Sequence, residues 1–464
     1  MSKGVPVGSQ RAASRLVRLA ATVALSACFV AGGVQTAGAV ALKDTSARTP
    51  AEVRARWASA KPRFAGSTIF VTRPNTSAPY SVGLLQPGYV NDALNRANFA
   101  RWLVGLPDDL TLDPTYMDLT QHAAVLLSAT GQFTHHPAKP ADMSQEFFDL
   151  GYKGTSSSNL AWAARDLSHS VQMYLDDHDS TNIAHVGHRR WVLSPSMSKT
   201  GFGEHGSKSA MYAFDSSRVD EVVWDHIAWP SAGAFPLEFF SDDHRLATFG
   251  YIEYGRPWSI QLNGMLYDID PAGVVVSLTR VSDGKSWTFN ADDRPYEGKK
   301  WGAEYLNVDG MTIIFRPDTT MVYKSGEAFD VRVGGTVYAK DTTNPVEIKY
   351  RTTFCKLTLP HASVGKPAAP KRVRRAKKFA VSGTLKPQHA AGNGVVRIYK
   401  DRKRAGKWVS QGYADARLSN YKTYSRYKVS LKLGTKGSWR IRACALADSK
   451  HSKSWSKYSY VTVR

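Results

Sequence analysis

The first clear pattern of apolar and polar positions along the chain is helical. YVNDALNRANFARWLVGL, from residue 89, starts with an Asn/Asp cap and ends near Gly105. The next helix is better marked, because Asp113 precedes it as a cap, Pro114 stands at its first position and Gly131 follows its end. Weaker helical patterns cover residues 144–150 and 167–177, which makes residues 85–230 a mixed α/β block.

One stretch of this block predicts a strand instead. VGHRRWVL (186–193) alternates, and a glycine-rich segment, GFGEHGS, follows it. Strand alternation places Trp191 on the same face as Leu193 and opposite His188, so we expect Trp191 in the core.

Beyond residue 236 the pattern changes to short alternating runs. PWSIQLNG, GVVVSLTRV, WTFNA, MTIIFRP, AFDVRVGG and EIKYRTTF are separated by Gly, Asp, Asn and Pro, which predicts an immunoglobulin-like β sandwich over residues 231–360. Residues 361–378 are rich in Pro, Ala and basic side chains and predict a linker. The same β pattern returns in residues 379–464, where Tyr427, Val429, Leu431 and Leu433 are expected to point inward. The expected fold class is therefore α+β and multidomain.

The N-terminal residues have the pattern of a targeting segment. Four basic residues precede the apolar run LAATVALSACFVAGGV (19–34), and the small-residue site AGA ends at Ala39. This predicts a secretory signal peptide over residues 1–39, because the apolar run is shorter than the roughly 20 residues that span a bilayer. LSAC, ending at Cys28, also resembles a lipobox, so membrane anchoring by a lipidated Cys28 is an alternative to free secretion. Residues 40–84 are polar with scattered Pro and Arg and predict an extended leader.

The net charge of +22 is unevenly distributed along the chain. Residues 366–464 contain 26 basic and 3 acidic residues, whereas residues 40–365 contain 31 basic and 36 acidic residues. A strongly cationic C-terminal module on a mildly acidic body implies an anionic partner. In a secreted protein we expect an anionic cell-wall polymer or cell surface rather than nucleic acid.

Two cysteines follow the predicted signal peptide. Strand alternation puts both Cys355 and Cys444 on the outward face of their strands. A disulfide between them, joining the last two domains, is one expectation for an extracellular protein, and two unpaired thiols are the alternative.

The common hydrolase signatures are missing, since the chain has no HExxH, GxSxG, phosphate-loop or paired CxxC motif. Candidate chemistry lies in histidines and acids of the α/β block. They are His135 and His136 in GQFTHHP, Asp176, Asp177, His178 and Asp179 in YLDDHD, and His185 and His188 in HVGH. Imidazole and carboxylate are ligands for zinc and similar divalent ions, and histidine is also a common general base, although loop histidines and helix-capping acids share this spacing.

Three ordered stretches resemble the CAP superfamily, the group of cysteine-rich secretory proteins, antigen 5 and pathogenesis-related proteins. The first runs from Asn98 and Arg101 through GLP, LDP and QHA to GQFTHHP; the second is SSNLAWA (157–163), similar to the family's GENIA-type segment. The third is YLDDHDSTN followed by VGHRRWVLSP, similar to the family's GH-x-T-Q strand. The resemblance covers residues 85–230 and implies an α-β-α sandwich with a cavity that holds two histidines and two acidic residues, and a divalent metal in several members.

Carried over to this chain, the resemblance implies a site of His135, His188 and Asp177. Asp177 stands in for the family's second glutamate, three residues after Tyr174. The first glutamate is missing, because Ser158 precedes Asn159 where the family has Glu. His185 or Asp176 would have to compensate for it. We expect Asn159 to be a structural hydrogen-bonder and Arg189 and Arg190 to form ion pairs.

Two functions remain open from the sequence. The first is a non-enzymatic, secreted binding protein whose cavity takes an unknown ligand or protein, with a C-terminal module (366–464) that attaches to an anionic cell wall. The alternative is a metal-dependent hydrolase of peptide or wall polymer, in which His135, His188 and Asp177 hold an ion that activates water. The missing glutamate favours the binding protein. In the C-terminal module, YKTYSRYK and SKHSKSWSKYSY interleave cations with aromatic residues, a composition that suits anionic polymers and sugars.

Overall fold

The computed structural model describes residues 47–179, 181–219, 222–240, 256–294, 304–317, 321–448 and 450–464. The predicted signal peptide, Cys28 and the start of the leader lie outside these residues. Within the described ranges, no helix is both long and apolar enough to cross a membrane.

The predicted extended leader contains a helix, α1 (Pro50–Ala60), so that part of the prediction was wrong. The helix is set by local chemistry: Thr49 and Glu52 form a capping box, and Pro50 occupies the first position. Val53 is fully buried in the main core. The remaining leader forms a short hairpin, β1 (Phe70–Thr72) with β2 (Leu84–Leu85).

The four predicted helices of the α/β block are confirmed. They are α2 (Pro87–Leu103), α3 (Pro114–Thr130), α4 (Gln145–Ser156) and α5 (Leu167–Asp176). The ends of α3 are those expected, because the Asp113 carboxylate accepts hydrogen bonds from two backbone N–H groups and Gly131 adopts φ 68°. Only α2 begins earlier, at a proline that suits the first helical position.

The strand predicted at VGHRRWVL was wrong, since these residues form the short helix α6 (Gly187–Val192). Its cause is a contact distant in sequence: the backbone N–H of Arg189 donates to Oδ2 of Asp177 at 2.8 Å, which satisfies a free donor of the first turn. Trp191 consequently lies outside the core, 41% exposed, with its ring 4.5 Å from that of Phe214. The glycine-rich segment forms a hairpin, β6 (Phe202–His205) and β7 (Lys208–Tyr212).

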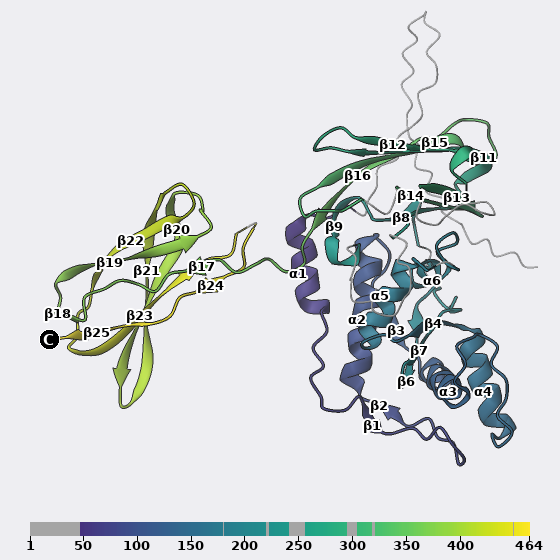
Figure 1. Cartoon of the computed structure of the whole chain (residues 1–464), viewed down its shortest axis with the longest axis horizontal. Coiled ribbons are helices and arrows are strands. Elements are labelled where there is room, and N and C mark those ends of the chain that lie inside the picture. Colours follow the sequence, from purple (N-terminus) through teal and green to yellow (C-terminus); the bar gives the residue numbers. More distant parts are fainter. Residues whose placement is uncertain are drawn as a thin grey trace, which may run out of the picture. The chain divides into compact units, whose positions relative to one another are not determined.

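These elements form three layers. β4 (Ser158–Trp162), β7 and β6 make an antiparallel sheet in that order. Leu160 and Ala210 pack with α3 on one face, whereas Ala161 and Met211 join the core that includes α2 and α5 on the other (Figure 1). Two further short strands, β3 (Thr111–Leu112) and β5 (Lys199–Thr200), form a separate parallel pair.

Two further sheets pack face to face and contain all six strands predicted after residue 236. One has the order β13 (Tyr305–Asp309), β14 (Thr312–Arg316), β10 (Trp258–Leu262), β8 (His226–Trp229). The other has the order β12 (Ser286–Phe289), β11 (Tyr267–Arg280), β15 (Ala328–Ala339), β16 (Ile348–Cys355), β9 (Gly233–Pro236). Short 3-10 helices are Leu237–Phe239 and Ala291–Asp293.

The predicted boundary at residue 230 falls inside this sandwich. β8 precedes the boundary and pairs with β10, and one buried cluster runs through α1, α2, α5 and both sheets. Arg189 reinforces the connection, because its guanidinium donates to the Ser259 hydroxyl of β10 at 2.9 Å. The α/β block and the first sandwich therefore share a core.

The C-terminal β domain is a nine-stranded sheet around a core of its own. Its strands are β17 (Ser363–Val364), β18 (Arg372–Val373), β19 (Lys378–Lys386), β20 (Gly392–Arg404), β21 (Lys407–Asn420), β22 (Ser425–Lys432), β23 (Gly437–Ala445), β24 (Ser454–Trp455) and β25 (Ser459–Val463). Tyr427, Leu431 and Leu433 are buried as predicted, and Val429 is partly buried.

The predicted linker 361–378 is part of this domain rather than a connector. β17 pairs with β19, and β18 pairs in parallel with β25. The Tyr427 hydroxyl also donates to the carbonyl of Gly365 at 2.7 Å. These backbone and side-chain hydrogen bonds hold the segment on the sheet. The composition of the segment, rich in Pro, Ala and basic residues, does not predict them.

The disulfide considered between Cys355 and Cys444 is not formed, and both thiols are buried and unpaired. Cys444 does alternate with the core residues Ala443 and Ala445, as expected, but the expected exposure of both thiols was wrong, because both are buried. Cys355 belongs to the main core, and its burial raises the pKa of its thiol to about 11, which disfavours the reactive thiolate. Mixed α and β content in several packed units confirms the coarse fold class; the CAP and immunoglobulin-like assignments remain predictions.

Candidate functional site

Asp177 and His188 form a buried acid–histidine pair. Asp177 ends α5 in the left-handed region, φ 41°, and its side chain is completely buried. Its Oδ1 accepts a 2.8 Å hydrogen bond from Nδ1 of His188, whose side chain is 20% exposed. Because Nδ1 is occupied by the carboxylate, Nε2 is the ring nitrogen of His188 that remains for a ligand or proton.

The electrostatics of this pair favour a charged imidazole. Burial alone lowers the pKa of His188, but the charge of Asp177, its hydrogen bond and the charge of Asp179 together raise the pKa above its ordinary value. Asn159, from β4, donates through Nδ2 to the His188 carbonyl at 3.0 Å, which confirms its expected structural role.

His135, the third residue of the predicted metal site, does not form one compact ligand group with this pair. The ligand atoms of His135, Asp177 and His188 do not all lie within 4.8 Å of one another, and Nδ1 of His135 donates to the Thr155 carbonyl at 2.8 Å. The Thr155 hydroxyl donates back to the His135 carbonyl at 3.0 Å, so the histidine is tied to the end of α4. His136 likewise pairs with α4, through the Tyr152 hydroxyl at 2.9 Å.

The neighbouring acids and basic residues have structural partners. Asp176 is buried, and its Oδ1 lies 2.8 Å from Nε of Arg256. Exposed His185 lies 3.3 Å from a carboxylate oxygen of Asp309, which also accepts from Arg190 at 2.7 Å. The expected ion pair of Arg190 is therefore confirmed, whereas Arg189 is buried among backbone carbonyls and a hydroxyl.

Sequence reasoning missed Glu204, which lies in the glycine-rich segment GFGEHGS. It lies in β6, 7% exposed, and Oε2 accepts a 2.9 Å hydrogen bond from the Tyr89 hydroxyl. Burial raises the pKa of Glu204 to about 7; the Tyr89 hydrogen bond lowers it, and the charge of Asp166 raises it further. Because this carboxyl is buried, its ionisation near neutral pH lowers the free energy of unfolding.

We expect Glu204→Gln to stabilise the protein at pH 8 by roughly 1–3 kcal/mol and to have little effect at pH 5. The folded carboxyl keeps its proton to about pH 7, well above the ordinary value of 4.5, so the wild-type chain loses stability as the pH rises through that window. Urea unfolding at both pH values measures this, with exposed Glu146→Gln as the control. Equal stability of wild type and variant at pH 8 would contradict it.

The C-terminal β domain presents cations and aromatic rings together on one surface. The alternate residues Ile398, Ile441 and Val461 are buried in the core, so their strand neighbours project from the opposite face. We call this surface the cationic aromatic face; its members are Arg397, Tyr399, Lys403, Trp408, Tyr413, Arg440, Arg442, Lys453, Trp455, Tyr458 and Tyr460.

Strand register builds this face from residues distant in sequence. Tyr399 in β20 stands opposite Tyr413 of β21 on one side and Arg442 of β23 on the other. The Arg442 guanidinium lies 3.8 Å from the ring centre of Trp455, and the rings of Tyr399 and Trp455 are 4.9 Å apart. Arg442 and Tyr399 lie outside the two runs of cations and aromatic residues found in the sequence, YKTYSRYK and SKHSKSWSKYSY. The alternation in WRIRAC and VVRIYK nevertheless indicates that both side chains lie on the outward face of their strands.

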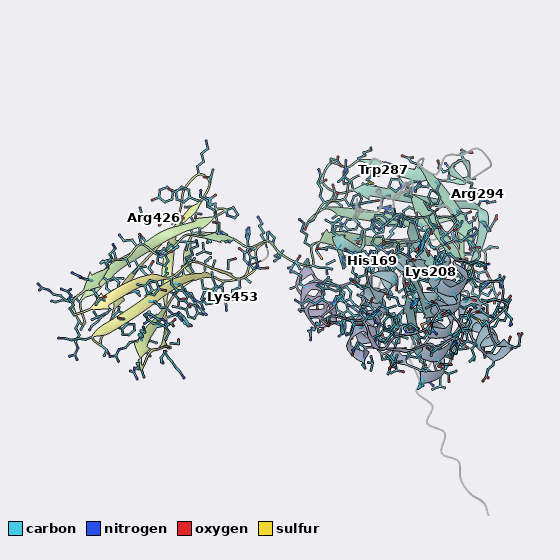
Figure 2. All side chains as sticks on the ribbon, turned by 60° about the horizontal axis from the view of Figure 1, so that its bottom comes forward. His169, Lys208, Trp287, Arg294, Arg426 and Lys453 are labelled. Carbon is cyan, nitrogen blue, oxygen red and sulfur yellow. The ribbon has the colours of Figure 1, made fainter. Side chains whose placement is uncertain are left out.

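The charge of the face is only partly neutralised. Asp401 pairs with Arg440 at 2.8 Å and Asp415 with Arg397 at 3.2 Å. Among the described residues, no carboxylate contacts Arg442 or Lys453. Basic side chains also lie outside this face: Arg426, in β22, is labelled in Figure 2 together with Lys453. The arrangement can hold anionic groups beside planar or sugar rings.

Comparisons with known proteins leave the family open. No protein-family model and no curated protein matches the chain. Among solved structures it is similar to superoxide reductase (neelaredoxin) from Ignicoccus hospitalis, with 15% identity, a TM-score of 0.16 and coverage of 23% of this chain and 82% of that chain. It is also similar to a chimeric titin Z1Z2–Z1Z2 tandem, with 13% identity, a TM-score of 0.14 and coverage of 45% of this chain and 90% of that chain. Scores this low carry no argument about family or function.

Proposed function

We propose that this chain is a secreted binding protein that attaches to an anionic polymer of the cell wall or cell surface through the cationic aromatic face. The observation that carries the proposal is the stacking of Arg442 on Trp455, next to Tyr399 and Lys453, within a domain of large positive charge. Guanidinium and ammonium groups attract phosphate or carboxylate, and exposed aromatic rings stack on sugars.

The attachment is proposed as non-enzymatic. For the α/β block we propose a CAP-type domain, supported by the order of its motifs and by a three-layer arrangement, with a ligand or protein partner of its own. The hydrolase alternative has less support, because the ligand atoms of His135, Asp177 and His188 do not all lie within 4.8 Å of one another. Ser158, at the position of the family's glutamate, supplies no carboxylate.

Two charge-matched triple variants test the proposal. The face variant replaces Lys403, Arg442 and Lys453 by Gln. The control variant replaces Arg426, Lys428 and Lys432, three exposed residues of β22 outside the face. Both lose three positive charges, so general attraction to a polyanion falls equally.

We expect the face variant to bind isolated cell walls about ten- to a hundredfold more weakly than wild type, since each of the three lost cation contacts contributes roughly 0.5–1 kcal/mol. The control variant should lose no more than about threefold. Retention is measured over a sodium chloride series, because screening weakens charge contacts. Equal losses of affinity in the two variants would show that binding depends on net charge alone, and would overturn the role of the face.

A further inference from the structure

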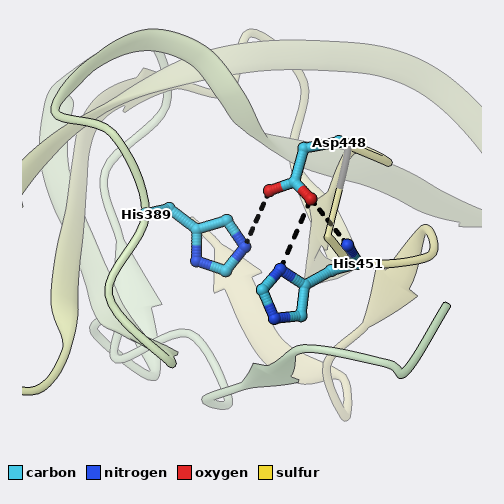
Figure 3. Close-up of side chains that lie close together, drawn as sticks. All are labelled: His389, Asp448 and His451. Atoms are coloured by element: carbon cyan, nitrogen blue, oxygen red, sulfur yellow. Dashed lines mark hydrogen bonds and ion pairs between the residues drawn. The ribbon is translucent and has the colours of Figure 1, made fainter. Parts of the chain in front are cut away.

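Two loops of the C-terminal β domain bring together His389, Asp448 and His451 (Figure 3). His389 follows β19, whereas Asp448 and His451 lie between β23 and β24. One potential ligand atom from each residue lies within 4.8 Å of the other two. Nε2 of His389 is 3.3 Å from Oδ2 of Asp448, and Nδ1 of His451 is 3.4 Å from Oδ1.

His389 is held in position by the fold before any ligand binds. Its Nδ1 lies 2.8 Å from the Pro387 carbonyl, which only accepts, so Nδ1 carries the proton and the lone pair of the neutral ring is on Nε2. Its backbone N–H donates to the Ser425 hydroxyl of β22 at 2.9 Å. A histidine whose second nitrogen donates to a carbonyl has the outer contact usual for metal ligands.

The other two residues are also oriented toward the same point. Oδ1 of Asp448 accepts from the backbone N–H groups of Lys450 at 2.7 Å and His451 at 2.6 Å. The side chain of His389 is 2% exposed and that of His451 is 12% exposed. Their ring centres are 4.7 Å apart, and neither Nε2 of His389 nor Nδ1 of His451 has a hydrogen-bond partner of proper geometry in the described residues.

This arrangement places buried, unsatisfied ring nitrogens around one carboxylate. With neutral rings, the lone pair of His389 Nε2 faces a negatively charged oxygen, which is unfavourable unless a cation lies between them. Protonating His389 would instead place a positive charge on a side chain that is only 2% exposed. A single divalent ion satisfies all three groups at once.

We propose that His389, Asp448 and His451 form a divalent transition-metal site of the zinc type. Two imidazole nitrogens and one carboxylate oxygen suit zinc better than calcium or magnesium, which prefer oxygen ligands. Three protein ligands leave one tetrahedral position for water or an external donor.

The bound ion ties together loops that also secure the start of the domain. Ser452, next to His451, donates through its backbone N–H to the Pro360 carbonyl at 2.9 Å and through its hydroxyl to the Leu359 carbonyl at 2.7 Å. Metal binding is therefore expected to stabilise the C-terminal β domain against unfolding.

The test uses the untagged full chain lacking only the predicted signal peptide, stripped of metal with a chelator. Zinc per chain is measured by elemental analysis, cobalt binding by visible absorption, and stability by thermal unfolding with and without zinc. His389→Ala, His451→Ala and Asp448→Asn remove one ligand each. His361→Ala, at an exposed histidine of the same domain, is the control.

We expect one zinc per wild-type chain, a higher melting temperature with zinc, and at least tenfold weaker binding in each ligand variant, with the control unchanged. If nearly buried His389 is needed for folding, Asp448→Asn and His451→Ala decide, provided their metal-free melting temperatures match wild type. Absence of zinc binding by wild type, or undiminished binding in the ligand variants, would overturn the proposal.

Discussion

Replacing Arg189 by Ala is expected to lower the free energy of unfolding by roughly 3–5 kcal/mol. Arg189 is only 1% exposed, and its guanidinium donates to the carbonyls of Leu175 and Asp176 at 2.7 and 3.0 Å. It also donates to the Pro257 carbonyl at 3.0 Å and the Ser259 hydroxyl at 2.9 Å. The variant leaves these acceptors buried without a donor and opens a cavity between the end of α5 and β10.

Arg190, the adjacent residue, supplies a matched control. Its side chain is 37% exposed, and its ion pair with Asp309 is of the surface kind. Arg190→Ala should therefore cost no more than about 1 kcal/mol. Calorimetric unfolding of both variants measures the difference. A similar loss of unfolding free energy in the two would show that the buried hydrogen bonds of Arg189 do not stabilise the protein more than the surface ion pair of Arg190.

Asp177→Asn is expected to lower the free energy of unfolding by roughly 2–4 kcal/mol, with the larger loss at acidic pH. Asparagine tolerates the left-handed backbone at this position, φ 41°, so the change removes the charge rather than the conformation. The remaining imidazole of His188 then lies mostly buried without its carboxylate, and the N–H of Arg189 loses a charged acceptor.

The pH dependence follows from the raised pKa of His188. Because the folded chain holds this proton to higher pH than the unfolded chain, the stabilisation is complete below the ordinary value of 6.5 and is lost as the pH rises through the folded pKa. The cost of Asp177→Asn should thus be greater at pH 5.5 than at pH 9, by urea unfolding. His185→Gln, at an exposed histidine, should leave the profile unchanged. A cost that does not vary with pH would refute the charged pair.

Local signals explain which elements were predictable. Asp113 and Gly131 bound α3 as expected because caps act on backbone groups a few residues away. Alternation found the strands of the sandwich because one face of each is buried. The capping box at Thr49 and Glu52 was an equally local signal for α1 that the polar composition of the leader obscured.

Prediction failed where distant contacts decide. VGHRRWVL becomes a helix because Asp177 accepts from the Arg189 N–H, and Trp191 consequently faces outward. His135 was grouped with Asp177 and His188 by family resemblance, but the ligand atoms of the three do not all lie within 4.8 Å of one another. Cys355 joins the main core and Cys444 is fully buried, which strand alternation alone could not indicate.

The sequence by itself determined the principal helices and strands, the concentration of positive charge after residue 366 and the cation–aromatic character of that module. These depend on period, caps and composition, which act within a few residues. Only the tertiary structure decided that Arg442 stacks on Trp455 beside Tyr399, and that His389 meets Asp448 and His451. Strand register and loop closure create such neighbours, and their interactions stabilise the protein only once the intervening chain has packed.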